Sequence, residues 1–386
     1  MLIRNIYSWI YLLLACAMIS IGKIYDERLI LFDFNFGVIF SVLFLIFSIY
    51  SILTVQKLNV TASMQWMFLF LSYLLLSPIL WSIYSYTEIG LEKYINFVSI
   101  VIPIVFLSNK FKIIDVKKFF NILLYLVFFL AFLGAIKLGN SVGRLSVLGG
   151  GPIIFARWML IGVFILFFMK KKKWTNNFLI ITLVLLSIAS GSRGPILSFL
   201  LTILIFFVLN LRRSFISFFL VSIFLSILFT LITLNKMDDV GKADRLLTKN
   251  KTSKNVRLEF ASRSLELVYK YPFGVGIGNW QEYCNQSQPH HLLRHEYPHN
   301  LLLEIFVELG ILGGLIFLYL LIKSIYFTYK RYLLNKSSPI YPLLFYLQIF
   351  LLFNSLFSGS LNDSRLLFVV LAFGITAHPL LLKRYE

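Results

Sequence analysis

The length, composition and charge of the chain restrict its class. The chain has 386 residues, of which 59% are hydrophobic and 14% charged, with a mean hydropathy of +0.84 and a net charge of +19. Soluble domains carry about 25% charged residues. The composition therefore excludes a soluble enzyme and indicates an all-α integral membrane protein.

Apolar runs in chain order predict about twelve transmembrane helices, since a spanning helix needs about 20 mostly apolar residues. The runs lie at residues 6–22, 30–54, 66–82, 95–108, 119–138, 152–169, 175–190, 194–210, 214–234, 299–322, 339–358 and 365–382. The runs at 95–108, 175–190 and 194–210 are short, so the predicted number of helices is twelve to within one or two. The first run lacks a small-residue cleavage site and is interpreted as a signal anchor.

These runs divide the chain into three expected parts. An N-terminal transmembrane bundle of about nine helices occupies 1–234, and about three C-terminal transmembrane helices occupy 299–386. Between them, 235–298 forms one long loop that is expected to contain short amphipathic helices.

Lysine and arginine residues predict the orientation. With the N-terminus in the cytoplasm, the cytoplasmic segments carry 18 basic residues and the opposite short loops carry 7. Because short cytoplasmic loops are enriched in Lys and Arg, both termini are expected to be cytoplasmic and 235–298 to face outward. Half of the basic residues then serve topology, and the positive charge needs no nucleic-acid partner.

Cysteine and histidine usage predicts neither a disulfide framework nor a metal site. Cys16 lies in the first apolar run and Cys284 in the long loop, where it has no cysteine partner. Four histidines cluster at 290–299, but no acidic or cysteine ligand completes a standard zinc pattern. The glycines at 274–278 lack the remainder of a dinucleotide fingerprint and are interpreted as a glycine-rich bend.

The first candidate site is the turn SGSRGP at 190–195, between two predicted spans. Pro195 suits the first turn of the following helix. Free backbone N–H groups and the guanidinium of Arg193 suit an anion. The alternative is a tight turn whose arginine snorkels to water.

The second candidate is Arg257, at the start of a predicted amphipathic helix at 256–271. The apolar stripe of that helix consists of Leu258, Ala261, Leu265 and Val268. The stripe predicts a helix on the outer surface of the bundle, with Arg257 away from the stripe. The alternative is an arginine that faces solvent or lipid headgroups.

The third candidate is His299, which begins the predicted span at 299–322. The positive end of a helix should lower its pKa and leave a neutral imidazole able to accept a proton. Asn300, Glu304 and Glu308 follow on one helix face. Carboxylates inside a membrane helix are costly, so both should face the bundle interior or a wet cavity. The alternative for a histidine at a helix end is a structural or solvated side chain.

These three stretches resemble the O-antigen ligase and O-antigen polymerase superfamily of bacterial inner membranes. The Ser-Arg-Gly turn, Arg257 followed by YPFGVGIGN at 271–279, and His299-Asn300-x9-Gly310-x2-Gly313 carry the resemblance, which covers about 190–314. Related ligases often have a second histidine two residues before the first, where this chain has Tyr297. That difference puts the choice of acceptor in doubt.

The resemblance implies a glycosyltransferase that moves a glycan from undecaprenyl diphosphate to a sugar hydroxyl at the periplasmic face, without metal or other cofactor. It implies that His299 is the general base and that Arg193 and Arg257 bind the diphosphate and stabilise the leaving group. The expected substrate contacts are Asn300, Glu304, Arg144, Arg157 and Arg365.

The implied partners are the lipid-linked glycan donor, a glycan or lipid A-core acceptor, membrane lipids and, as a candidate, a chain-length regulator. Three functions stay open: a polymerase of lipid-linked repeat units, which is favoured, a ligase that transfers glycan onto lipid A-core, and a lipid-linked glycan flippase. A transporter typically has broken helices and a charged site at mid-membrane. The polar residues singled out above instead gather at one face.

Overall fold

The computed structural model describes residues 2–31, 34–54, 62–83, 87–108, 113–138, 144–148, 150–170, 173–210, 253–285, 297–335 and 337–376. Within these ranges the regular secondary structure is helical apart from a small hairpin, in which β1 (Ile30–Leu31) pairs antiparallel with β2 (Phe34–Asn35). The all-α prediction is confirmed.

The helices follow one another along the chain in two groups. The N-terminal part contains α1 (Leu2–Ile21), α2 (Phe36–Leu53), α3 (Ala62–Leu76), α4 (Glu88–Ser108), α5 (Ile113–Leu138), α6 (Pro152–Met169), α7 (Trp174–Ala189) and α8 (Arg193–Asn210). The C-terminal part contains α11 (Ser253–Lys270), α12 (Trp280–Asn285), α13 (Leu301–Glu308), α14 (Gly310–Leu334), α15 (Ile340–Ser358) and α16 (Arg365–Thr376). Short 3-10 helices are η1 (Glu27–Leu29), η2 (Ser77–Ser82) and η4 (Asn362–Ser364).

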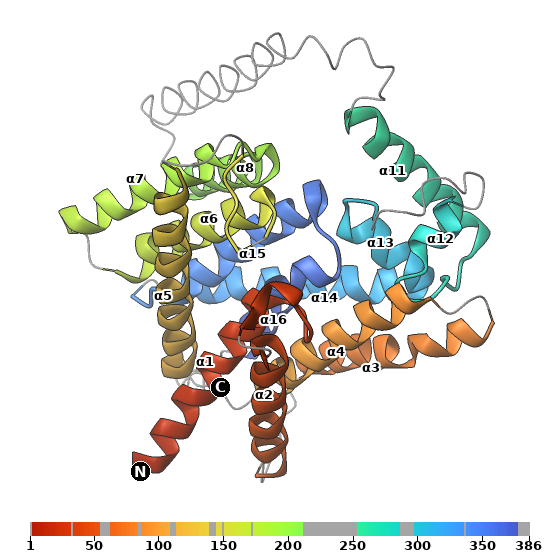
Figure 1. Ribbon diagram of the computed structural model, residues 1–386, viewed down its shortest axis with the longest axis horizontal. Coiled ribbons are helices and arrows are strands. Elements are labelled where there is room, and N and C mark those ends of the chain that lie inside the picture. Colours follow the sequence, from red (N-terminus) through yellow and green to blue (C-terminus); the bar gives the residue numbers. More distant parts are fainter. Residues whose placement is uncertain are drawn as a thin grey trace.

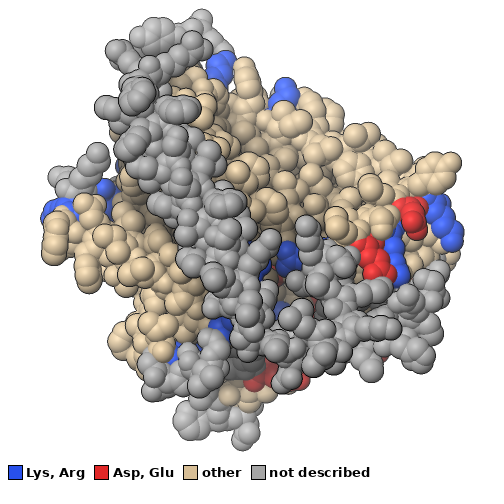
Figure 2. Space-filling view, turned by 90° about the horizontal axis from the view of Figure 1, so that it is seen from above, with Lys and Arg blue, Asp and Glu red and all other residues tan. Residues whose placement is uncertain are grey.

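Eight segments of the described chain are long and apolar enough to cross a membrane: α2, α3 with η2, α4, α5, α6, α8, α14 and α15. Tyr7–Ile21 and Trp174–Ala189 are shorter apolar helices. Eleven of the twelve predicted runs coincide with described helices, and the run at 214–234 lies outside the described residues. Multiple apolar helices and the mostly uncharged surface in Figure 2 identify an integral membrane protein.

The core of the bundle forms around α15 and α16. In Figure 1, α6, α7, α8 and α15 lie together on one side, and α3, α4 and α14 lie together on the other. Helix α15 contacts α6, α8, α14 and α16, and α16 contacts α4 and α14. Residues 366–375 of α16 are all buried. A helix that is apolar on every side suits either a protein core or a membrane span, and α16 is enclosed by its neighbouring helices.

The predicted span at 299–322 is wrong as a single helix. It is broken at Leu309 into α13 and α14, and Gly310 has φ +72°, a left-handed value that favours glycine. Helix α14 has 25 residues and is long enough to span alone. Helix α13 is therefore a short helix distinct from α14.

The predicted packing face of α11 also needs correction. Leu258 and Leu265, two members of the predicted stripe, are exposed, whereas Phe260 and Leu267 are buried. The indole of Trp280 explains this rotation, since its ring packs on Phe260 and its Nε1 donates to Ser264 Oγ at 2.9 Å. The helix therefore packs through the face that meets α12 and α13.

Candidate active site

The glycine-rich segment at 272–279 fixes α13 against α4. Gly274, Gly276 and Gly278 all have φ between +80° and +91°. A Cβ on Gly274 would lie 2.5 Å from Gly310 N, and a Cβ on Gly278 would lie 2.2 Å from Gly90 Cα. Glycine is therefore required both for the backbone conformation and for the close approach.

Backbone hydrogen bonds also connect the glycine-rich segment to α13 and to the start of α14. Val275 N donates to Val307 O at 3.0 Å, and Gly276 N donates to the carbonyl of Glu308 at 2.9 Å. Ile311 N donates to Pro272 O at 2.8 Å. The bend thus satisfies the polar groups at the break between α13 and α14. The prediction of a glycine-rich bend is confirmed.

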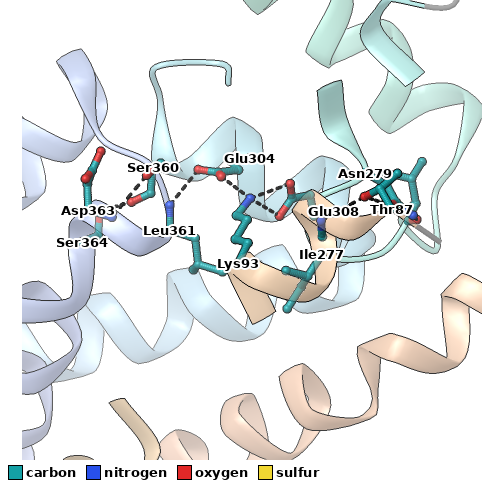
Figure 3. Close-up of polar contacts among 12 residues, drawn as sticks. Thr87, Lys93, Ile277, Asn279, Glu304, Glu308, Ser360, Leu361, Asp363 and Ser364 are labelled. Carbon is teal, nitrogen blue, oxygen red and sulfur yellow. Dashed lines mark hydrogen bonds and ion pairs between the residues drawn. The ribbon is translucent and has the colours of Figure 1, made fainter. Parts of the chain in front are cut away.

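A buried ion cluster joins α4 to α13 (Figure 3). Lys93 Nζ donates to both carboxylate oxygens of Glu308 at 2.6 Å and also to Glu304 Oε1. The two glutamate side chains are 1% and 3% exposed, and that of Lys93 is 13% exposed. Both carboxylates therefore face the interior, as the sequence predicted, and Lys93 is the partner that the sequence did not identify.

The ion cluster also holds the turn between α15 and α16, residues 359–364. Glu304 Oε2 accepts a hydrogen bond from the backbone N–H of Leu361 at 2.9 Å. Figure 3 shows the continuous line of contacts from Lys93 through Glu304 to this α15–α16 turn. Substrate contact by Glu304 stays a prediction, and the structure gives its carboxylate a positioning role.

His299 and Asn300 form the start of α13. Asn300 Oδ1 accepts from the backbone N–H groups of Leu302 and Leu303 at 3.0 and 3.2 Å, so Asn300 is the N-cap of the helix. Substrate binding by Asn300 stays a prediction. His299 precedes the cap with φ +56°, an uncommon conformation for a residue other than glycine.

The imidazole of His299 is partly enclosed and packs on Tyr297, with ring centroids 4.1 Å apart. Burial, followed by the positive charge of Arg257, lowers the pKa of His299 to about 4. A lowered pKa favours the neutral imidazole that the sequence predicted, with burial and Arg257 as its causes in place of the helix end. A neutral imidazole has a free lone pair and can accept a proton.

Arg144 organises the turn that carries Arg193. Its Nε donates to Ser190 O at 3.3 Å, and its Nη2 donates to Gly191 O at 3.0 Å and to Ser192 Oγ at 3.1 Å. Arg193 is exposed and is the first residue of α8, with Pro195 in the first helical turn as predicted. Arg144 therefore supports the turn directly, and its contact with substrate stays a prediction.

The turn and Arg257 meet at the end of α15. A Cβ on Gly194 would lie 3.2 Å from Ser358 Oγ, which shows how closely α8 starts against α15. Arg257 Nη1 donates to Phe357 O at 3.3 Å. The charge of Arg257 also reaches His299, whose pKa it lowers. Gly194 and Arg257 therefore both lie against the end of α15, and Arg257 lies near enough to His299 to act on its pKa, although the three stretches are far apart in sequence.

Arg157 and Arg365 flank the α15–α16 turn. Arg157 Nη1 donates to the backbone carbonyl of Asp363 at 2.7 Å, and Arg365 Nη1 donates to Gly22 O at 2.8 Å. Arg157 is 8% exposed. Asp363, which was not among the sequence candidates, lies near enough to His299 to act on its pKa. The sequence contained one signal for Asp363: it is an acidic residue just before the predicted apolar run at 365–382, two positions from Arg365.

No group of three or more potential metal ligands occurs among the described residues. His290, His291 and His295 lie outside the described part of the chain. The arginines described above suit an anionic substrate, and the histidine suits the role of proton acceptor.

A model of the O-antigen ligase family matches residues 178–318, a segment that contains all three candidate stretches. No curated protein matches the chain. The match supports the resemblance drawn from the motifs and shows that residues 178–318 are similar to the O-antigen ligase family. It also indicates glycosyl transfer of the O-antigen ligase or polymerase type in a multi-pass membrane protein.

Proposed function

We propose that this protein transfers a glycan from undecaprenyl diphosphate to a sugar hydroxyl, without metal or other cofactor. The observation that supports this most is that the Ser-Arg-Gly turn and Arg257 both lie against the end of α15, with Arg257 near enough to His299 to lower its pKa. A proton acceptor beside exposed guanidinium groups is the combination that this reaction requires.

The reaction follows from the roles of these groups. The imidazole of His299 takes the proton of the acceptor hydroxyl, and the acceptor oxygen forms a bond to the anomeric carbon of the donor sugar. The bond between that carbon and the diphosphate oxygen breaks, and its electron pair leaves on the diphosphate. Arg193 and Arg257 bind the diphosphate and stabilise the negative charge that develops there, an effect worth about 3–4 kcal/mol for a well-placed donor in comparable sites.

We place this chemistry at the periplasmic face of the inner membrane, with both termini in the cytoplasm. The distribution of basic residues supports this orientation. Hydrogen bonds that join the end of α1 to the start of α16, and the end of α15 to α11, support a single polar end of the bundle. All site residues belong to that end.

The transfer is tested by replacing His299. We expect His299→Ala to lower the rate of transfer by about 10²–10⁴-fold, measured with purified protein and undecaprenyl diphosphate bearing one repeat unit. Lys137→Ala removes an exposed cation that bonds only the Ser146 carbonyl among the described residues, and should leave the rate unchanged. Near-normal transfer by His299→Ala, at equal protein level in the membrane, would reject the assignment of the base.

The acceptor distinguishes polymerase from ligase. The polymerase is favoured, whereas the description of the matching family as O-antigen ligase supports the ligase. Gel profiles of surface polysaccharide from a deletion strain separate them, because loss of a polymerase leaves core with one repeat unit, and loss of a ligase leaves bare core and lipid-linked polymer. A flippase would form no glycosidic bond with purified components.

A further inference from the structure

Helix α11 has a second apolar face, which its packing on α12 and α13 does not use. Phe260 and Leu267 of this helix are buried against those two helices. Leu258, Leu265 and Tyr269 are instead 63%, 60% and 91% exposed. Because successive residues of an α-helix are turned by about 100°, these three form one face, the α11 stripe, opposite the buried pair. Two leucines of the apolar stripe predicted from the sequence therefore lie at the surface, where Tyr269 extends the stripe.

The charged residues of α11 form a third face. Glu259, Arg263, Glu266 and Lys270 recur at helical spacing, about 100° around the axis from the α11 stripe. Glu259 and Arg263 pair with one another at 2.7 Å, and Glu266 and Lys270 are exposed. With six charged residues among its 18, α11 does not qualify as a membrane span. Separate apolar and charged faces are typical of a helix that lies in the membrane interface.

Both ends of α11 are attached to ends of membrane-spanning helices. Arg257 Nη1 donates to the carbonyl of Phe357, in the last turn of α15, at 3.3 Å. Pro272 O, two residues after α11, accepts from the N–H of Ile311, in the first turn of α14, at 2.8 Å. Because α14 and α15 are consecutive spans in contact, they cross in opposite directions, and these two ends lie on the same side of the bundle. Helix α11, at the edge of the described helices in Figure 1, therefore lies where the spanning helices leave the bilayer.

The exposed apolar surface continues from α11 onto α14. Phe273, which follows α11, is 72% exposed, and its carbonyl carbon would lie 2.3 Å from a Cβ on Gly310, the first residue of α14. In the first turns of α14, Ile311, Leu312 and Leu315 are 41%, 58% and 54% exposed. Exposed apolar side chains on a spanning helix are covered by lipid. The α11 stripe is therefore joined, across Phe273, to a surface that faces lipid.

We propose that the α11 stripe is a membrane-docking surface, which lies in the interfacial region of the bilayer on the side where α14 begins. The occupant is lipid and not a second protein, because lipid already covers the adjoining surface of α14. Tyrosine and lysine at the end of α11 also suit the boundary between lipid and water. The charged face then points to water, and the buried pair stays on α12 and α13. The proposal is independent of the transferase function, and it holds Arg257 at the depth of the lipid phosphate groups.

Spin labels on single cysteines measure where the α11 stripe lies. The full chain carries Cys16→Ala and Cys284→Ala, which remove both native cysteines, and is reconstituted in phosphatidylcholine vesicles. Oxygen is more soluble in the bilayer and a neutral nickel chelate is more soluble in water, so the ratio of their collision rates with the label reports its surroundings. We expect a high oxygen-to-nickel ratio for Leu265→Cys, as for Leu315→Cys on the lipid-facing side of α14. Glu266→Cys, one residue further on the charged face, should give a lower ratio.

Two results of this measurement overturn the proposal. Equal ratios at positions 265 and 266 mean that the α11 stripe faces water. Low collision rates with both reagents at position 265 mean that protein covers the stripe, either a segment of this chain outside the described residues or a second copy of the chain.

A second measurement keeps the native cysteines and tests a different position of the stripe. Tyr269→Trp adds one indole to the six tryptophans of the chain. Its added fluorescence is compared in vesicles of ordinary phosphatidylcholine and of phosphatidylcholine brominated on the acyl chains, since bromine quenches indole on contact. We expect the brominated lipid to remove most of the fluorescence added by Tyr269→Trp and little of that added by Glu266→Trp. Equal quenching of the two variants overturns the proposal.

Discussion

Replacing Lys93 by Met should destabilise the protein strongly. The substitution leaves Glu304 and Glu308, whose side chains are 1% and 3% exposed, without their cation. At an effective dielectric constant of about 20, charges 2.6 Å apart attract by about 6 kcal/mol before desolvation is counted. Desolvation offsets part of this attraction, and removal of one partner from a buried pair typically costs about 3–5 kcal/mol. We expect a loss of that size in the free energy of unfolding.

Unfolding in detergent micelles with increasing denaturing detergent measures this free energy. The control is Lys23→Met, which breaks the pair with Glu92 at 2.9 Å, where both side chains are nearly half exposed. It should cost less than about 1 kcal/mol. Neutralising the carboxylates as well, with Gln at 304 and 308, should recover most of the stability of Lys93→Met. Wild-type stability of Lys93→Met, or no recovery in the triple variant, would refute the reasoning.

The candidate site supports three more predictions. Because the pKa of His299 is about 4 and the base must be neutral, kcat/KM should be constant from pH 7 to about 5 and fall to half near pH 4, and a fall near pH 6.5 would contradict this. Gly274→Ala should destabilise the protein by more than about 1 kcal/mol, since its φ is +91° and the new Cβ would lie 2.5 Å from Gly310 N. Gly150→Ala, at a residue without positive φ where the new Cβ would meet no atom closer than 3.4 Å, should cost much less in the same thermal-unfolding assay. Asn300→Ala should cost about 1 kcal/mol as a lost N-cap, and Asn300→Ser should restore stability and transfer. A transfer defect in Asn300→Ser at full stability would instead indicate substrate contact.

The sequence was informative where one physical rule dominates. Hydropathy predicted the helices because a bilayer tolerates only apolar side chains and a backbone whose N–H and C=O groups are hydrogen-bonded within the protein. The same cost predicted that Glu304 and Glu308 face inward, as they do. The cost argument did not identify Lys93 as the partner. Two buried carboxylates require a nearby cation, but the sequence does not show which lysine or arginine the fold places beside them.

The sequence was less informative where tertiary contacts decide the outcome. The break after Glu308 depends on hydrogen bonds from the 272–276 backbone, which no local pattern in 299–322 reveals. The face of α11 depends on Trp280, which packs from a different helix. Asp363 entered the site only because α15 and α16 place their connecting turn beside Arg157.

The proposed reaction affects the basicity of His299. The charge of Arg257 helps to lower the pKa of His299, and the same charge is proposed to bind the diphosphate. In the free enzyme this makes His299 a weak base, but a bound diphosphate would neutralise Arg257 and remove that contribution. The pKa of His299 should therefore rise when the donor binds.

This rise is measurable because kcat/KM reports the free enzyme and kcat reports the complex with substrate. The acid limb of kcat should lie at higher pH than that of kcat/KM, displaced from about 4 toward the ordinary value of 6.5. With Arg257→Gln the two limbs should move together, because the charge that the donor neutralises is already absent. Coincident limbs in the unmodified enzyme would mean that Arg257 does not face the diphosphate, and its role in donor binding would have to be abandoned.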